Sequence, residues 1–126
     1  MPLLELNTRS RLINEFFEYS LEQLQKDYPT IQEINILNKD FLYRQGDHCS
    51  SFFWIKSGIV KLSHLTEQGT EITTALLKQG DVMGGAQNNS VIQEMEETAQ
   101  ALGEVNLYRI AYNDFKTLMS HRAELA

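Results

Sequence analysis

The sequence has a single cysteine, Cys49, among 126 residues. One thiol excludes a disulfide within the chain, a four-cysteine zinc site and an all-cysteine iron–sulfur cluster. The first ten residues, MPLLELNTRS, lack the basic segment followed by an apolar segment that marks a secretory signal. Apolar runs are only a few residues long, whereas a membrane-spanning helix requires about 20. We therefore expect a cytoplasmic protein with no membrane partner.

Basic residues are also scarce: 11 lysines and arginines stand against 17 aspartates and glutamates, so the formal net charge is −6. A chain this acidic is repelled by a phosphate backbone. Phe52, Phe53 and Trp54 form an aromatic cluster, but without interleaved basic residues it indicates core packing rather than stacking on bases. We therefore expect contact with DNA only through residues that are not in this sequence. The length fits one domain that can build a core without disulfides.

Clusters of reactive side chains are missing as well. The three histidines, His48, His64 and His121, lie far apart, whereas a cupin-type metal centre normally has two histidines separated by one residue. No serine or cysteine has a recognisable base and orienting acid for nucleophilic catalysis. We expect no catalytic residue, no metal site and no cofactor, and hence no enzyme. His48 and Cys49 have the chemistry to ligate haem or sense oxidation, but we interpret them as an exposed loop pair.

Residues 8 to about 28 have the apolar spacing of a helix, with Thr8 or Ser10 as its N-cap. Pro29 ends this helix, because a proline disfavours helical geometry in the residue before it. We interpret the apolar stripe as core packing and residues 1–30 as an N-terminal helical lead. The stripe consists of Leu12, Ile13, Phe16, Phe17, Leu21 and Leu24.

From residue 31 the apolar period changes to two, which is typical of strands, and turn residues recur at intervals of about 8–12. The sequence therefore predicts an antiparallel sandwich or roll over residues 31–112, with a hairpin tip at residues 67–70 and the last strands at 98–102 and 105–110. The alternating residues include Ile34, Ile36, Phe41, Tyr43, Val60 and Leu62. The predicted turns are 38–40, 45–47, 56–58, 67–69 and 79–81. Positive φ angles are expected at Gly46, Gly58, Gly69 and Gly80.

After Tyr112 a new helix is expected, with Asn113 as its N-cap. Its apolar face consists of Phe115, Leu118 and Met119. About three turns of helix at a chain terminus are weak alone. We therefore interpret residues 113–126 as the start of a longer helix and the sequence as a fragment, with a naturally short protein as the alternative.

Four separated blocks between residues 33 and 119 indicate a particular protein family, which the alternation of apolar residues does not. They are Tyr43–Asp47 (YRQGD), Phe53–Leu62 (FWIKSGIVKL) followed by Glu67–Ile72 (EQGTEI), Leu77–Gly84 (LKQGDVMG), and Ala99–Leu102 (AQAL) with the run to Ile110. In this order the blocks resemble the effector domain of Crp–Fnr-type bacterial transcription regulators. Within that family, GIVKLSHLTEQGTEITTALL is most similar to the cyanobacterial nitrogen-control regulators.

The resemblance implies a mainly β fold, an antiparallel double-stranded β-helix or jelly-roll-like β-roll, with an N-terminal helix and the start of a C-terminal helix. It also implies homodimers in which a dimerisation helix and a helix-turn-helix, both absent from this sequence, act on DNA. A small-molecule effector shifts such a system only by binding one arrangement more tightly than another. We interpret the chain as an effector-sensing domain and, alternatively, as a stand-alone ligand-binding module with an output other than DNA.

The resemblance places the ligand-binding residues at Gly84, Gly85, Ala86, Glu97, Thr98 and Ala99. Family members that bind cyclic nucleotides hold the ribose with a glutamate just after the glycine and the phosphate with an arginine further on. Here Gly85 occupies the expected glutamate position, and no lysine or arginine occurs from Gln79 to Tyr108. Acidic residues in that stretch are Asp81, Glu94, Glu96, Glu97 and Glu104.

Burying a phosphate near these carboxylates without a cation is strongly unfavourable. We therefore expect a degenerate phosphate site that does not hold cyclic AMP in the usual pose, and the same argument weakens 2-oxoglutarate. An arginine from the absent dimer helix is an alternative source of a cation. The polar segment 84–90 is either a remodelled ligand loop or a solvent loop, so the effector is unknown or absent.

Overall fold

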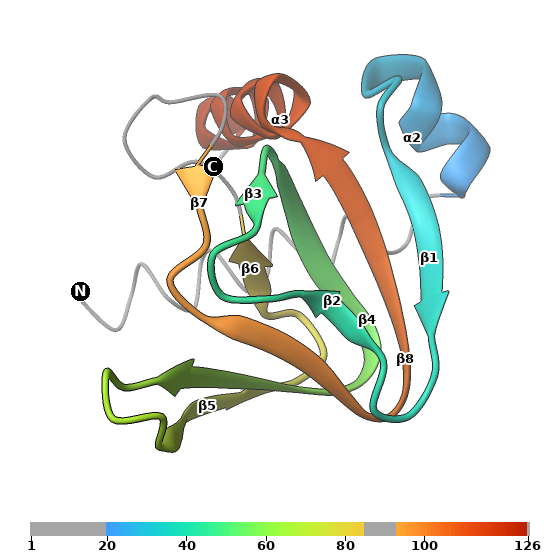
Figure 1. Cartoon of the computed structure of the whole chain (residues 1–126). Coiled ribbons are helices and arrows are strands. Elements are labelled where there is room, and N and C mark those ends of the chain that lie inside the picture. Colours follow the sequence, from blue (N-terminus) through green and yellow to red (C-terminus); the bar gives the residue numbers. More distant parts are fainter. Residues whose placement is uncertain (1–19, 85–92, 126) are drawn as a thin grey trace.

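The computed structural model describes residues 20–84 and 93–125 (Figure 1). The described residues form a mainly β, antiparallel domain, which confirms the predicted fold class. The elements are α2 (Leu21–Asp27), β1 (Gln32–Ile36), β2 (Phe41–Tyr43), β3 (His48–Cys49), β4 (Ser51–Leu65), β5 (Glu71–Leu77), β6 (Val82–Gly84), β7 (Gln93–Glu94), β8 (Thr98–Ala111) and α3 (Tyr112–Leu125). Neither of these two helices is long and apolar enough to cross a membrane.

The two long strands, β4 and β8, organise the sheet. Its order is β1-β8-β4-β5, with β2 also paired to β8 and β6 to β4. β3 and β7 form a separate two-stranded sheet. β4 and β8 run from α3 to the opposite end of the molecule, where the β4–β5 hairpin extends away from both helices (Figure 1). All these pairings are antiparallel.

The predicted turn at residues 56–58 is wrong, because these residues lie inside β4. The register with β8 shifts on both sides of Ser57, so the strand bulges instead of turning. Gly58 has φ +99°, and a Cβ added there would lie 2.5 Å from the carbonyl oxygen of Glu104. Only glycine fits such a close approach of two strands.

The last two predicted strands, 98–102 and 105–110, form one continuous strand, β8. Gly103 has φ +84°, and the register with β4 passes from Leu102 to Asn106 across the irregular stretch. The chain therefore bends through a bulge without leaving the sheet.

The expected glycine conformations are confirmed: φ is positive at Gly46, Gly58, Gly69 and Gly80. The hairpin tip at residues 67–70 is confirmed as well. The Gly69 amide donates to the Thr66 carbonyl at 2.9 Å, and the Thr66 amide donates to the Thr70 carbonyl at 2.9 Å.

The first described helix does not continue the predicted helix from residue 8. Ser20 has an extended backbone (φ −69°, ψ 153°), and its hydroxyl accepts the Gln23 amide, while the Gln23 side chain accepts the Ser20 amide. This capping box starts α2 at Leu21, so a continuous helix through Ser20 is wrong. The Ser-x-x-Gln spacing was the sequence signal for this start. Residues 8–19, including the proposed caps Thr8 and Ser10, lie outside the described residues.

α3 begins at Tyr112, so Asn113 lies inside its first turn and not at the predicted cap. The Tyr112 amide donates to the Ser50 carbonyl at 3.0 Å. Asp114 accepts hydrogen bonds from the amide and the hydroxyl of Thr30, at 2.9 and 2.6 Å. The Ser50 contact joins the start of α3 to the residue between β3 and β4, and the Thr30 contacts join it to the segment between α2 and β1.

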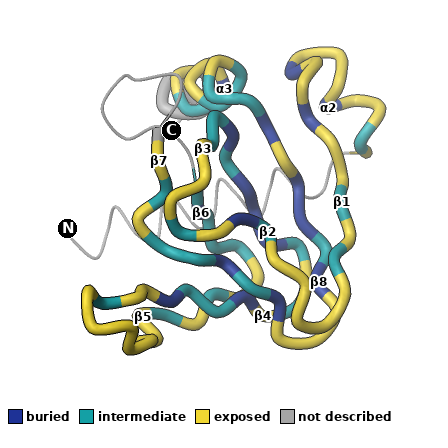
Figure 2. Tube along the Cα trace, in the orientation of Figure 1, coloured by how far each residue is buried: buried dark blue, intermediate teal, exposed yellow. Residues whose placement is uncertain are grey.

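Two apolar cores lie on opposite faces of β4 and β8, because successive strand residues point to opposite sides. Trp54 and Phe53 are both buried, but in different cores. Buried segments recur along both strands (Figure 2). The helix-side core contains Leu24, Tyr28, Ile31, Trp54, Tyr108, Ile110 and Leu118, with Phe52, Phe115 and Met119 packed against it. The roll core contains Tyr43, Phe53, Ile55, Val60, Met83, Ala99, Ala101, Val105 and Leu107.

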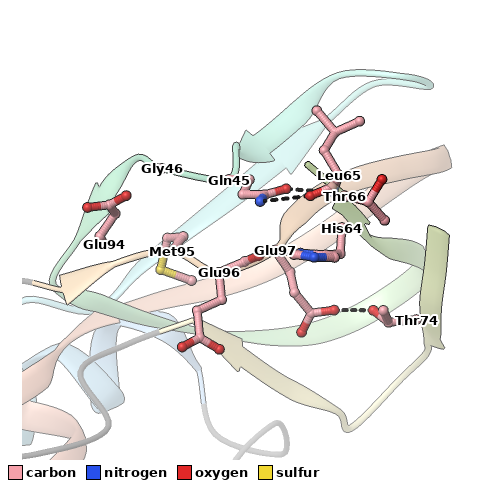
Figure 3. A pocket seen from close by; sticks show the side chains of 10 residues that line it. All are labelled: Gln45, Gly46, His64, Leu65, Thr66, Thr74, Glu94, Met95, Glu96 and Glu97. Carbon is pink, nitrogen blue, oxygen red and sulfur yellow. Dashed lines mark hydrogen bonds between the residues drawn. The ribbon is translucent and has the colours of Figure 1, made fainter. Parts of the chain in front are cut away.

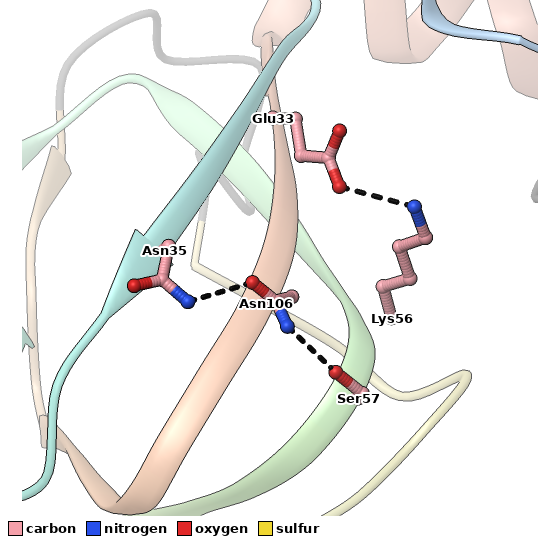
Figure 4. Close-up of polar contacts among 5 residues, drawn as sticks. All are labelled: Glu33, Asn35, Lys56, Ser57 and Asn106. Carbon is pink, nitrogen blue, oxygen red and sulfur yellow. Dashed lines mark hydrogen bonds and ion pairs between the residues drawn. The ribbon is translucent and has the colours of Figure 1, made fainter.

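Polar side chains link β1, β8 and β4 across the bulge (Figure 4). Asn35 Nδ2 donates to Asn106 Oδ1 at 2.7 Å, and Asn106 Nδ2 donates to Ser57 Oγ at 3.0 Å. Lys56 forms an ion pair with Glu33 at 3.0 Å, and this hydrogen bond raises the pKa of the lysine. The bulged part of β4 is thus held in register by side chains as well as by backbone.

Candidate functional site

An open hollow lies where the β4–β5 hairpin meets the segment before β8 (Figure 3). Its volume is about 1070 Å³. We call it the acidic hollow. It is lined by Gln45, Gly46, His64, Leu65, Thr66, Thr74, Glu94, Met95, Glu96 and Glu97.

Gln45 joins the first glycine turn to the hairpin. Its side-chain oxygen accepts the Leu65 amide at 2.8 Å, and its side-chain nitrogen donates to the Leu65 carbonyl at 3.4 Å. The Gln45 backbone amide donates to the Thr98 hydroxyl at 2.9 Å. One residue therefore connects β4, the turn and the start of β8.

The opposite wall is the acidic segment before β8. The Gly46 amide donates to the Met95 carbonyl at 2.8 Å. Nδ1 of His64 lies 3.3 Å from the carbonyl oxygen of Glu96. The Thr74 hydroxyl donates to the Glu97 carboxylate (Figure 3). These contacts hold three glutamates around the hollow, while none of its described lining residues is a lysine or arginine.

Of the four predicted ligand residues that the structure describes, only Glu97 lines this hollow. Glu97 lines it, but the Thr98 hydroxyl is engaged by Gln45, and Ala99 is completely buried in the roll core. Gly84 ends β6 beside the start of β4: a Cβ on it would lie 2.9 Å from both the Phe53 ring and the Ser51 carbonyl oxygen. Gly85 and Ala86 lie outside the described residues. That these six bind a ligand stays a prediction.

A second hollow, of about 400 Å³, lies at the start of β4. Its lining includes Ser51 and Phe53, the two residues that closely approach Gly84. We call it the arginine hollow. It is lined by Leu42, Tyr43, Asp47, His48, Cys49, Ser50, Ser51, Phe53 and Arg109.

The sequence did not predict a role for Arg109. The stretch considered for a ligand cation ends at Tyr108, one residue before it. In the sheet Arg109 pairs with Phe53 across β4 and β8, so both side chains lie on the roll face. Nε of Arg109 donates to the Ser51 hydroxyl at 3.3 Å. Alternation along the strand predicts that Arg109 lies on the same face as Leu107. Only the pairing with Phe53 shows that this face is the one that bears the roll core.

His48 and Cys49 form the short strand β3, so the expectation of a loop pair is wrong, although His48 is exposed as expected. Cys49 is half-buried, and its thiol donates to the Ser51 carbonyl at 3.3 Å. Burial raises the pKa of the Tyr43 phenol above its usual range, and the nearby charges of Cys49 and Glu97 add to the effect. Within the described ranges, no group of three or more His, Cys, Asp or Glu side chains is arranged to hold a metal ion.

A profile of the cyclic nucleotide-binding domain matches residues 33–122 of this sequence. The chain belongs to the cyclic nucleotide-binding domain family. The match includes every described strand except the first residue of β1. None of the curated proteins matches the chain.

Solved structures share the family fold. The sensor domain of the transcriptional regulator DNR from Pseudomonas aeruginosa has a TM-score of 0.69 at 23% identity, over 91% of this chain and 79% of that one. The N-terminal domain of a transcriptional regulator from Streptomyces coelicolor A3(2) has a TM-score of 0.65 at 23% identity, over 86% and 77%. The catabolite activator protein of Thermus thermophilus has a TM-score of 0.67 at 21% identity, over 84% of this chain and 52% of that one. This chain therefore spans about half of the Thermus protein.

Proposed function

We propose that this chain is the effector-sensing domain of a Crp–Fnr-type DNA-binding regulator, and that its roll does not hold cyclic AMP. The family match and the regulators among its structural neighbours support a sensing role. The observation that carries the ligand proposal is the acidic hollow: in the part of the chain that the structure describes, three glutamates line it and no lysine or arginine does. An anion placed there would meet carboxylates without a compensating cation.

DNA contact and homodimerisation belong to this proposal as properties of the longer protein. The chain's net charge of −6 is consistent with a module that leaves DNA binding to other residues. In such a protein an effector acts by binding one arrangement of the roll and the dimer helix more tightly than the other.

A thermal-shift scan against millimolar cyclic AMP, cyclic GMP and 2-oxoglutarate tests the ligand proposal. A ligand at about a hundred times its dissociation constant stabilises a fold by about 2.7 kcal/mol, which raises the unfolding midpoint by several degrees. We expect no shift with either cyclic nucleotide. A clear, saturable shift with cyclic AMP would show that the roll binds the phosphate by another route.

The alternative is a stand-alone ligand-binding module with an output other than DNA. The length and charge of the complete reading frame separate the two. A basic helical segment after residue 126 would support the regulator, and a natural stop codon at that point would support the alternative.

A further inference from the structure

The arginine hollow is lined by a guanidinium, that of Arg109, and by a phenol, that of Tyr43. Arg109 uses Nε to bond the Ser51 hydroxyl. Among the described residues, its terminal guanidinium nitrogens have no hydrogen-bond or ion-pair partner. Since Ser51 is only 7% exposed, this bond anchors the guanidinium from the sheet side. A guanidinium held in this way presents a planar pair of donors, the geometry that binds a carboxylate.

Tyr43 supplies the second donor. Its side chain is 8% exposed and packs against Phe53, with the ring centroids 6.1 Å apart. Tyr43 is among the residues that line the hollow. A phenolic hydroxyl can donate a hydrogen bond to an acceptor that occupies the hollow. The phenol stays protonated at neutral pH, so it can donate to an anion.

The charges around the hollow limit the ligand. Asp47 is on the rim, and its Oδ2 already accepts the Arg44 amide at 2.8 Å. This carboxylate disfavours a second negative charge on the ligand. Leu42 and Phe53 provide apolar wall. A volume of about 400 Å³ is at the lower end of the roughly 300–1,000 Å³ typical of small-molecule sites.

We propose that the arginine hollow binds a small monocarboxylate, whose carboxylate is held by Arg109 and the Tyr43 hydroxyl and whose apolar part lies against Phe53. The site is distinct from the acidic hollow, because the two have no described lining residue in common. The proposal does not depend on the regulatory output proposed above.

The only cysteine of the sequence reports directly on this hollow, because Cys49 lines it. The test uses benzoate as the probe and measures the rate at which the neutral reagent N-ethylmaleimide alkylates the protein. Benzamide, which has the same shape without the charge, is the control ligand, and ionic strength is held constant with sodium chloride. We expect benzoate to slow alkylation in a saturable way and benzamide to have little effect.

Three variants locate the binding. Arg109→Gln should weaken protection by benzoate about tenfold or more, and Tyr43→Phe by roughly fivefold. Arg109→Lys, which retains the charge without the planar fork, should give an intermediate loss. Arg44→Gln is the matched control, since Arg44 lies over the Phe41 ring and does not line the arginine hollow. Each rate is compared with that of the same variant without ligand, after its unfolding midpoint is measured.

The proposal is overturned if benzoate gives no saturable protection of the wild-type chain, if benzamide protects equally, or if Arg109→Gln and Arg109→Lys are both protected like the wild type. An equal loss in Arg44→Gln would also overturn it, because that result indicates general charge attraction. The two proposals fail separately. A thermal shift with cyclic AMP would contradict the proposed function, whereas protection of Cys49 by benzoate tests only the arginine hollow.

Discussion

Tyr43 illustrates how burial changes the chemistry of one residue. Its ring belongs to the roll core, while its hydroxyl reaches a hollow. Burial disfavours the charged phenolate, and the neighbouring Cys49 and Glu97 oppose a further negative charge, so the phenol pKa in the folded protein is raised from 10.0. An unfolded chain has no such environment, so its tyrosine ionises near the ordinary value.

This difference predicts a pH dependence of stability. Because the folded pKa is raised, the contribution of Tyr43 is fully present below pH 10 and is lost as the pH rises further, by about 1.4 kcal/mol at pH 11. Tyr43→Phe cannot ionise and should lose less stability over this interval. Urea unfolding of both proteins at pH 9, 10 and 11 measures the difference, in which other titrating groups cancel. Parallel losses in the two proteins would contradict the prediction.

The positions of single residues explain why the residues that line the two hollows were only partly predictable from the sequence. Glu97 was identified from the resemblance, and it does line a hollow. Arg109 was not, because nothing in its neighbours along the chain indicates that this exposed arginine borders a hollow. Its place beside Phe53 results from pairing between strands more than 50 residues apart in the sequence. Long-range register of this kind is not visible in local spacing.

At the scale of elements, β4 is a single strand that bulges where the sequence indicates a turn. Gly58 and Gly69 look alike in the sequence, and both have positive φ angles. The space around them differs. A Cβ on Gly58 would lie 2.5 Å from the Glu104 carbonyl oxygen and 2.9 Å from the Val105 Cα, whereas a Cβ on Gly69 would meet nothing within 4 Å.

Alanine substitutions separate the need for a positive φ, which both glycines share, from the close approach of β8, which affects only Gly58. Gly69→Ala introduces only the strain of an alanine with a positive φ, so we expect the free energy of unfolding to fall by about 1–2 kcal/mol. Gly58→Ala adds a collision with the backbone of β8, and the loss should reach about 3–4 kcal/mol. Urea denaturation of the two variants gives the comparison. If both lose the same amount, the bulge tolerates a side chain and the close approach does not constrain it.

At the scale of the whole molecule, the two cores are not independent. Both are built on β4 and β8, which contribute residues such as Trp54 to the helix side and Phe53 to the roll. Disrupting either face therefore removes packing from strands that the other face needs. The acidic hollow and the arginine hollow both border elements paired to these strands.

This shared construction predicts one cooperative unfolding transition. Trp54 is the only tryptophan in the sequence and reports on the helix-side core, while far-ultraviolet circular dichroism reports on the sheet. The two signals should give the same thermal midpoint. A sheet signal that persists after the tryptophan signal is lost would show that the roll core unfolds separately.

The sequence by itself determined the antiparallel β class, the positive φ angles of four glycines, the hairpin at residues 67–70 and the apolar face of α3. These features depend on residues close together in the chain, namely the alternation of a strand, the conformational freedom of glycine and the period of a helix. Local patterns therefore sufficed for them.

Tertiary structure alone decided that residues 56–58 and 103–104 stay within strands and that Arg109 and Tyr43 line the same hollow. The β4–β8 register shifts twice around Ser57, and a net one-residue shift moves every following side chain to the other face of the sheet. Which residues share a site thus follows from the pairing of distant strands, because that pairing sets the face on which each side chain lies.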